Sequence, residues 1–512
     1  MSNTLNQQKT KQIAKNTLFL YFRMALTMAI SLYTSRIILR NLGVVDFGIY
    51  NVVGGVVAML SFLTNAMTTG TQRFISFNLG IGNLERSRKV FSVCVSSHIF
   101  LALFVVLIAE SLGLLFFYSK LQIPLNRLDA AFWVYQFSIA TTFVSIVSIP
   151  YNAAIIAHEQ MKAFAYISVF EAVAKLAIAF SISFVKFDKL FFYGLLIMMV
   201  QLAIRLMYTK FCKKNFAETK FSFCKDWSLF KEILSFFGWT LFGQMGCMAV
   251  THGENILLNM FFGPVVNAAR GIAIQVDAAI SSFTVNFQVA VNPQITKSYA
   301  EGNLESHRRL IYVSAKYSCL LLILMSVPFL VETEHVLALW LGVVPENTVT
   351  FLRIILATKI FDSTANAVAV SAQATGQIKY YQIVCGIILF LALPISYFLS
   401  KMGYEAKYVL FTHFAISVMT QIARIAFLRK MVALSASDML AKVYAPCFVI
   451  CILSFLTPMI VVNFMSPSLL RMLCVFASSM LGTLVLVFTI GMNENERKIV
   501  LEFIRRKLVK KK

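Results

Sequence analysis

Long apolar segments recur along nearly the whole chain. A helix needs roughly 20 mostly apolar residues to cross a hydrocarbon core of about 30 Å, and about fourteen segments of this sequence reach that length. These segments are residues 17–39, 45–69, 90–118, 129–156, 163–185, 190–209, 235–261, 265–290, 310–331, 348–372, 380–399, 405–428, 443–463 and 469–490. Membrane barrel strands would instead alternate over segments of about ten residues. The sequence therefore predicts an all-α polytopic membrane protein with about 14 transmembrane helices.

Composition excludes a water-soluble globule. Of the 512 residues, 59% are hydrophobic and 13% are charged, whereas soluble domains are about half apolar and a quarter charged. The formal net charge is nevertheless +23. We interpret this positive charge as a signal of membrane topology and of contact with anionic membrane lipids. No nucleic acid is expected as a partner.

The Lys and Arg residues are distributed unevenly over the segments that join the apolar runs. When both terminal tails and every second connection are assigned to one side, that side holds most of the 46 Lys and Arg residues. Cytoplasmic segments are the ones enriched in these residues. The sequence therefore predicts a multi-pass protein of the cell inner (plasma) membrane with both termini in the cytoplasm.

The chain contains an internal repeat. The tetrapeptide GNLE occurs at residues 82–85 and again at 302–305, an offset of 220, and the same offset places Gly43 on Gly263. Six predicted helices lie between the copies, so both copies enter the membrane in the same direction. We expect two six-helix lobes related by a parallel pseudo-two-fold repeat, followed by two C-terminal helices. In each GNLE connection we expect a Gly with positive φ, an Asn N-cap and a Glu in the first helical turn.

This repeat divides the chain into five parts. We expect an N-terminal lobe at residues 1–211, a C-terminal lobe at 235–428 and two extra helices at 429–490. A cytoplasmic interfacial linker at 212–234 joins the lobes, and a basic cytoplasmic tail occupies 491–512.

The segment around the first copy of the repeat resembles a known superfamily. Residues 42–53, LGVVDFGIYNVV, and residues 68–91, TTGTQRFISFNLGIGNLERSRKVF, are similar to the opening lobe of polysaccharide exporters. These exporters include the O-antigen flippases and belong to the multidrug/oligosaccharidyl-lipid/polysaccharide (MOP) superfamily. The residues that carry the resemblance are Gly and aromatic positions together with one Arg: Gly43, Phe47, Gly48, Tyr50, Gly70 and Arg73.

The resemblance implies a transporter and no enzyme. It implies that an isoprenoid diphosphate-linked oligosaccharide is flipped from the cytoplasmic to the outer leaflet by alternating access, for cell-surface polysaccharide biosynthesis. The lipid-linked oligosaccharide would be the substrate, and other polysaccharide assembly proteins would be partners. The motif residues identify a fold more than a chemistry, so the site has to be sought among charges inside the spans.

Ionisable residues inside predicted spans are costly and usually face a polar cavity or a partner. The basic set is Arg23, Arg36, Lys175, Arg205, Arg270, Lys316, Arg353, Lys359 and Arg424. The acidic set is Glu110, Glu171, Glu254, Asp277 and Asp362.

Because cations outnumber anions, we expect a cavity for an anionic substrate, with substrate-binding residues Arg36, Arg270, Arg23, Lys316 and Lys359. Buried carboxylates can exchange ions with the cavity, so Glu254, Asp277 and Asp362 are the candidates for coupling to H⁺ or Na⁺. We expect no metal site, no cofactor and no catalytic residue.

Some of these charges have partners nearby on the same helix. Three pairs share a helical face. Glu171 and Lys175 are four residues apart, Lys359 and Asp362 three, and Arg270 and Asp277 seven. We expect the first of these pairs to be structural. Long side chains near span ends, such as Arg205 and Arg424, can reach the interface.

Two alternatives remain open. The first is an ion-coupled multidrug (MATE-like) antiporter of the same superfamily, whose passengers are cationic. The second is a membrane enzyme, a polysaccharide polymerase or acyltransferase, which would need catalytic groups in an outer loop. The longest outer connection, residues 332–347, contains Glu332, Glu334, His335 and Glu346 without a triad or metal-binding spacing.

Overall fold

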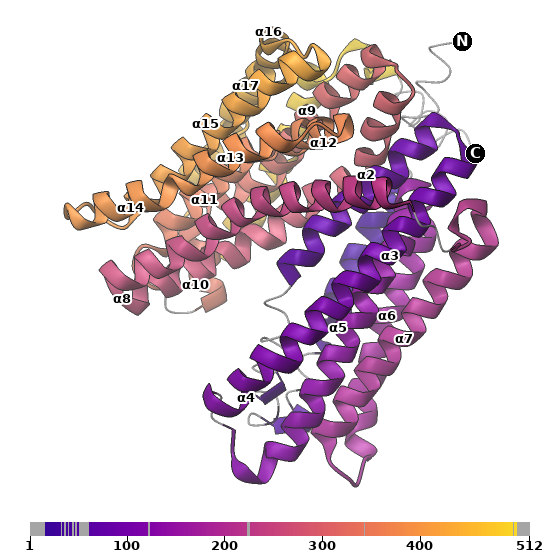
Figure 1. Cartoon of the computed structure of the whole chain (residues 1–512). Helices are drawn as coiled ribbons and strands as arrows, with labels where there is room; N and C mark the ends of the chain where they lie inside the picture. Colours follow the sequence, from indigo (N-terminus) through magenta and orange to yellow (C-terminus); the bar gives the residue numbers. More distant parts are fainter. Residues whose placement is uncertain are drawn as a thin grey trace, which may run out of the picture. The chain divides into compact units, whose positions relative to one another are not determined.

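The computed structural model describes residues 16–31, 33–34, 37–38, 40–43, 46, 49–50, 61–120, 123–222, 226–341, 344–494 and 496–498. Within these residues every regular element is helical (Figure 1). The chain divides into two compact units. Unit 1 comprises Met1–Gln244 and Val289–Asn303, and unit 2 comprises Met245–Gln288 and Leu304–Lys512.

Unit 1 is a bundle built around one long central helix. Its helices are α2 (Ser61–Ile81), α3 (Leu84–Ile108), α4 (Leu114–Lys120), α5 (Leu128–Ala157), α6 (Met161–Ser181), α7 (Lys189–Asn215) and the beginning and end of α8 (Trp227–Ala300). Residues 16–31 are also helical. Helix α5 packs against α2, α3, α6 and α7. Its apolar composition on all sides suits this central position.

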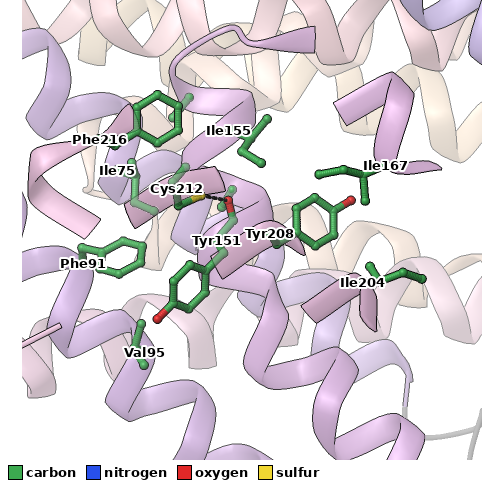
Figure 2. Packing of buried hydrophobic residues seen from close by; sticks show 13 residues of the cluster. Ile75, Phe91, Val95, Tyr151, Ile155, Ile167, Ile204, Tyr208, Cys212 and Phe216 are labelled. Atoms are coloured by element: carbon green, nitrogen blue, oxygen red, sulfur yellow. Dashed lines mark hydrogen bonds between the residues drawn. The ribbon is translucent and has the colours of Figure 1, made fainter. Parts of the chain in front are cut away.

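The core of unit 1 lies where α2, α3, α5, α6 and α7 meet (Figure 2). Phe91 and Tyr151 pack edge to face with ring centroids 5.1 Å apart. The thiol of Cys212 donates a hydrogen bond to the carbonyl oxygen of Tyr151 at 3.3 Å. Tyr151 is followed six residues later by the end of α5, where the connection to α6 begins.

The α5–α6 connection joins the end of α8 to unit 1. Glu159 has a left-handed backbone with φ 59° and is buried. Its carboxylate accepts hydrogen bonds from Gln294 Nε2 at 2.6 Å and from Lys297 Nζ at 2.7 Å. These contacts explain why residues 289–303 belong with unit 1.

Unit 2 contains the middle of α8 and the rest of the chain. Its longer helices are α9 (Leu304–Val331), α10 (Thr333–Leu341), α11 (Thr348–Asp362), α12 (Ala365–Thr375), α13 (Lys379–Phe390), α14 (Ala392–Lys401), α15 (Lys407–Val432), α17 (Ala445–Leu453), α18 (Leu456–Phe464) and α19 (Leu469–Leu486). Helix α15 packs against α11 to α14, and α9 packs against α11, α12, α17 and α19. Two π-helical segments, η5 (Leu440–Tyr444) and η6 (Val487–Gly491), lie in the last two predicted spans.

Helix α8 is a hairpin and not one straight rod. Gly263 interrupts it with φ 82° and ψ 178°, a conformation that only Gly adopts readily. In a straight helix, residues sixteen positions apart would be separated by about 24 Å. The side chains of Glu254 and Arg270 are instead in direct contact, 2.6 Å apart. We therefore call residues 227–262 the first arm of α8 and residues 264–300 its second arm.

The structure confirms the fold class, an all-α membrane protein with many spans. Ten helices of the described residues are long and apolar enough to cross a membrane. An eleventh span forms if α11 and α12, bent by 40° at residues 363–364, count as one. The predicted eighth span, 265–290, lies in the second arm of α8. The first two predicted spans fall partly outside the described residues, so the total of fourteen stays a prediction.

The backbone follows the repeat closely at its glycines. Gly43 and Gly263 have φ of 80° and 82°, and Gly82 and Gly302 have φ of 77° and 74°. The side chain of Asn83 accepts a hydrogen bond from the Arg86 backbone N–H at 3.0 Å, and Glu85 lies in the first turn of α3. These features confirm the expected GNLE connection. Further along, α7 begins at Lys189 and α15 at Lys407, so the offset has fallen from 220 to 218.

Candidate functional site

A buried ion pair bridges the two arms of α8 in unit 2. Nη2 of Arg270 donates a hydrogen bond to Glu254 Oε2 at 2.6 Å. The side chains of Arg270 and Glu254 are 4% and 0% exposed. Taking two charges out of water is costly and is offset only by close, well-bonded partners. The turn at Gly263 is what brings these two residues together.

Two further side chains complete the contacts of this pair. Nη1 of Arg270 donates to Asn255 Oδ1 and also to the Thr251 carbonyl oxygen at 3.2 Å. Nδ1 of His413, on α15, lies 3.0 Å from the second Glu254 oxygen, Oε1. We refer to Glu254, Asn255, Arg270 and His413 as the Glu254 cluster. It connects three helical segments of unit 2 through one carboxylate.

Three more charged residues surround the Glu254 cluster without direct ion pairs to it. Asp277, on the second arm of α8, is buried and accepts a hydrogen bond from Ser281 Oγ at 2.8 Å. It lies within electrostatic range of Lys359, Asp362 and His413. Lys359 and Asp362 are half-buried and lie in the last turn of α11. Unit 2 therefore contains a group of charges within electrostatic range of one another.

A helix break adjoins this group of charges. Helix α11 ends at Asp362 and α12 begins at Ala365, with a 40° bend between them. The side chain of Gln288 satisfies one carbonyl at the break, because its Nε2 donates to Ser363 O at 3.1 Å. Discontinuous helices near the bilayer midplane are typical of substrate and ion sites in secondary transporters.

The arrangement can couple a proton or cation to the packing of helices. The two oxygens of Glu254 contact two different partners, Arg270 and His413. Neutralising this carboxylate would leave Arg270 buried without its counter-charge, which is unfavourable in a low-dielectric interior. The contacts between the arms of α8 and α15 would then have to rearrange. The Glu254 cluster therefore has the chemistry of an ion-linked conformational switch.

The predicted site residues do not all meet at this place. Arg270, Glu254, Asp277, Lys359 and Asp362 lie together in unit 2, as described above. Arg36 lies outside the described residues.

Arg23 and Lys316 are not members of the Glu254 cluster. The Arg23 guanidinium, in unit 1, lies over the ring of Phe164 with 4.7 Å to the centroid. Lys316 is buried at one end of unit 2, with Nζ 3.1 Å from Glu496 Oε2.

The structure contains one of the local pairs expected from spacing and gives Arg270 another partner. Glu171 and Lys175 form the expected pair, with Lys175 Nζ donating to Glu171 Oε1 at 2.6 Å. Arg270 does not pair with Asp277, seven residues away on the same arm. It pairs with Glu254 because the hairpin brings the first arm of α8 into direct contact with Arg270.

Sequence reasoning missed two members of the cluster. His413 lies within the predicted span 405–428, where any ionisable residue deserves the scrutiny given to Lys and Glu. Asn255 directly follows Glu254 and, as an uncharged residue, was not among the candidates. The neighbouring His252 is exposed. Glu332, from the outer loop, is buried and binds Arg471, with Nε 2.8 Å from Oε1.

The fold is shared with known transporters. The chain matches no protein-family model and no curated protein. A structure titled as an outward-facing multidrug resistance MATE family transporter of the MOP superfamily superposes with TM-score 0.71 at 14% identity. The match covers 83% of this chain and 96% of that chain.

Two further solved structures show the same fold. A MOP superfamily transporter from Pyrococcus furiosus, described as having a binding pocket of reverse polarity, gives TM-score 0.67 at 13% identity over 82% of this chain and 96% of that one. The MATE transporter ClbM, in complex with Rb⁺, gives 0.66 at 14% identity over 84% and 97%. The chain thus has the MATE-like fold of a multi-pass membrane protein. These matches leave less than a fifth of this chain uncovered.

Proposed function

We propose that the chain is an ion-coupled membrane transporter of the MOP superfamily that exports its substrate by alternating access, with coupling located in the Glu254 cluster. The observation that carries this proposal is the contact geometry of Glu254. Its fully buried carboxylate binds Arg270 from the opposite arm of α8 and His413 from α15. The fold shared with MATE transporters supports the same class.

The proposed cycle follows from charge balance at Glu254. In the charged state the carboxylate holds the two arms of α8 and α15 together. Entry of a proton or a cation neutralises Glu254 and releases Arg270 to rearrange. The electrostatic field near the α11–α12 break then changes. The charged residues that experience this change are Asp277, Lys359 and Asp362. One solved neighbour is described with a bound alkali cation, Rb⁺, which supports testing Na⁺ as well as H⁺.

The geometry favours the antiporter over the flippase that the sequence resemblance implies. An anion-binding cavity was expected because cations outnumber anions in the spans. In unit 2, however, Arg270 is paired with Glu254, and Lys316 is paired with Glu496. Paired cations present less positive charge to an anionic diphosphate than free ones.

An observation in unit 1 favours flipping of a lipid-linked oligosaccharide as the second candidate function. The guanidinium group of Arg205 lies over the ring of Tyr151, with 4.2 Å to the centroid. A cation held on an aromatic ring keeps its positive charge for a diphosphate, and aromatic rings also pack on sugars.

The experiment is transport in proteoliposomes that contain the purified full-length chain. A cationic dye and an isoprenoid-diphosphate oligosaccharide are tested as alternative substrates, each with imposed H⁺ and Na⁺ gradients. We expect gradient-driven dye efflux, and we expect Glu254→Gln to reduce it by more than about tenfold, equivalent to about 1.4 kcal/mol. Glu171→Gln is the matched control, because it neutralises a span carboxylate outside the cluster, and it should retain most of the activity.

Each result decides between the candidates. Movement of the oligosaccharide lipid without dye efflux, weakened by Arg205→Gln, would replace the antiporter with the flippase. Transport of either substrate that is indifferent to Glu254→Gln would remove the coupling role from the cluster.

A further inference from the structure

A polar pocket lies at one end of unit 2, away from the Glu254 cluster. It has a volume of about 760 Å³ and is lined by the first turns of α9, the segment 433–446 and the segment 490–496. These last two segments belong to the two C-terminal spans that the six-helix repeat does not include. The pocket lies at the same end of α9 as the second GNLE connection. The predicted topology places this end at the cytoplasmic membrane surface.

The pocket has unpaired positive charge. Two of its four basic residues are engaged: Lys316 with Glu496 at 3.1 Å, and Lys442 with Asp438 at 3.0 Å. The other two, Arg308 and Arg309, have no ion-pair partner among the residues that the structure describes. Glu305 is the remaining carboxylate of the lining and is exposed. Two arginines that line one polar hollow suit a phosphate, which Arg binds through two parallel hydrogen bonds.

Both walls formed by the C-terminal spans contain an irregular helical turn. Ala441 and Lys442 lie in the π-helix η5, and Ile490 and Gly491 lie in the π-helix η6. Single π-helical turns are rare and occur frequently at functional sites. Two of them in the lining of one pocket are a second observation, independent of the charges, that supports a binding site at this end of unit 2.

The equivalent face of unit 1 is in contact with the connection after α7. At an offset of 220, Arg308 and Arg309 correspond to Arg88 and Lys89 on α3. There, Arg88 Nε donates to the Lys220 carbonyl oxygen at 3.2 Å, and the Ser222 N–H donates to Ser92 Oγ at 3.2 Å. Lys89 lies 3.6 Å from Glu85. In unit 1 the connection after α7 thus contacts the face whose counterpart in unit 2 lines the pocket.

We propose that this pocket binds the phosphate headgroup of an anionic phospholipid from the cytoplasmic leaflet, with Arg308 and Arg309 as its phosphate ligands. Basic pockets between membrane helices on the cytoplasmic side recognise such headgroups. The apolar outer surfaces of α17 and α19, with Phe448 68% and Val485 60% exposed, offer a path for acyl chains beside the headgroup. The proposal does not depend on what the Glu254 cluster transports.

The test is native mass spectrometry of the full-length protein titrated with phosphatidylglycerol or phosphatidylcholine. We expect tighter binding of phosphatidylglycerol. The double substitution Arg308→Gln/Arg309→Gln should weaken it by about tenfold or more, since each Lys or Arg near an anionic surface contributes roughly fivefold. Arg88→Gln/Lys89→Gln is the matched control, with the same change of charge at the equivalent position of unit 1, and should weaken binding less than about twofold.

Two further measurements can contradict the proposal. Glu305→Gln removes the opposing carboxylate, so it should strengthen phosphatidylglycerol binding even if the double variant fails to fold. No gain with Glu305→Gln would overturn the proposal, as would equal losses in both double variants. Inorganic phosphate and glycerol 3-phosphate contain the phosphate without acyl chains. If they bind as tightly as the lipid and lose binding in Arg308→Gln/Arg309→Gln, the pocket is a site for a soluble phosphate compound.

Discussion

The two copies of the repeat share a backbone turn but differ in the side chains around it. Nine residues before the positive-φ glycine, unit 1 has Thr34 and unit 2 has Glu254. Seven residues after it, unit 1 has Tyr50 and unit 2 has Arg270. Thr34 donates to the Ile30 carbonyl at 2.7 Å, whereas the unit 2 residues form a buried ion pair.

Aromatic packing takes the place of charge in unit 1. The rings of Tyr50 and Tyr193 meet at 4.7 Å in an edge-to-face arrangement. Such a contact stabilises packing and is insensitive to protons or cations near neutral pH. Both copies thus have the same turn, and at these two positions only unit 2 has the buried ion pair to which we assign coupling. The predictions below test this difference between the copies, from the largest expected effect to the smallest.

The largest effect is expected when one partner of the buried pair is removed. Arg270→Met leaves the Glu254 carboxylate without its counter-charge at 0% exposure. We expect the free energy of unfolding to fall by about 3 to 5 kcal/mol, measured by denaturant titration in mixed micelles. Glu254→Gln/Arg270→Met should recover most of the loss.

Tyr50→Phe, at the equivalent position of unit 1, should cost at most about 1.5 kcal/mol. Similar losses for Arg270→Met and Tyr50→Phe would mean that the copies do not differ as described.

The shared turn is tested by replacing its glycines. Gly263→Ala and Gly43→Ala each place a Cβ on a residue with φ near 80°. Each should lower the free energy of unfolding by about 1 to 3 kcal/mol. Only Gly263→Ala should also reduce gradient-driven transport, because the Glu254–Arg270 contact depends on that turn. Equal transport defects in both variants would argue for a purely mechanical role of the two turns.

The connection after the sixth helix of each copy also differs in burial. In unit 1, Glu218 is 5% exposed and bonds His158, whose ring stacks on Phe216 at 3.9 Å. In unit 2, the pair of Asp438 and Lys442 is 42% and 58% exposed. Burial alone would raise the pKa of Glu218, but the hydrogen bond from His158 outweighs it, and the pKa is lowered from its ordinary value of 4.5.

This lowered pKa gives a pH-dependent prediction. A carboxyl whose pKa is lower in the folded state contributes stability above its unfolded pKa and loses it as the pH falls through the folded pKa. Glu218→Gln should therefore cost about 1.5 kcal/mol at pH 7. The cost should shrink as the pH falls below about 4.5. Asp438→Asn should cost about 0.5 kcal/mol or less. Thermal unfolding of both variants between pH 3.5 and 7 measures this, and a pH-independent cost of Glu218→Gln would contradict the assignment.

The smallest effect is expected at the local pair in unit 1. Lys175 and Glu171 are 44% and 35% exposed, so solvent and salt screen their attraction. Lys175→Met should change the free energy of unfolding by about 0.3 to 0.5 kcal/mol, and dye transport should be unaffected. A large transport defect in this variant would show that unit 1 also has a coupling charge.

Much of the fold was predictable because its causes are local. Apolar runs of about 20 residues define membrane helices whatever their neighbours are, since an unpaired peptide group is too costly in hydrocarbon. The positive φ at Gly82 and Gly302 and the Asn83 cap could be read from four letters of sequence, GNLE. The pair of Glu171 and Lys175 followed from spacing within one helix.

The contacts of the candidate site could not be predicted in the same way. Sequence alone nominated Glu254, Arg270, Asp277 and Asp362 as charges inside spans, but spacing paired Arg270 with Asp277. The helical period determines which residues share a face of one helix. It says nothing of how two helices are rotated and shifted against each other. Only the tertiary structure, through the hairpin at Gly263 and the packing of α15, places Glu254 between Arg270 and His413.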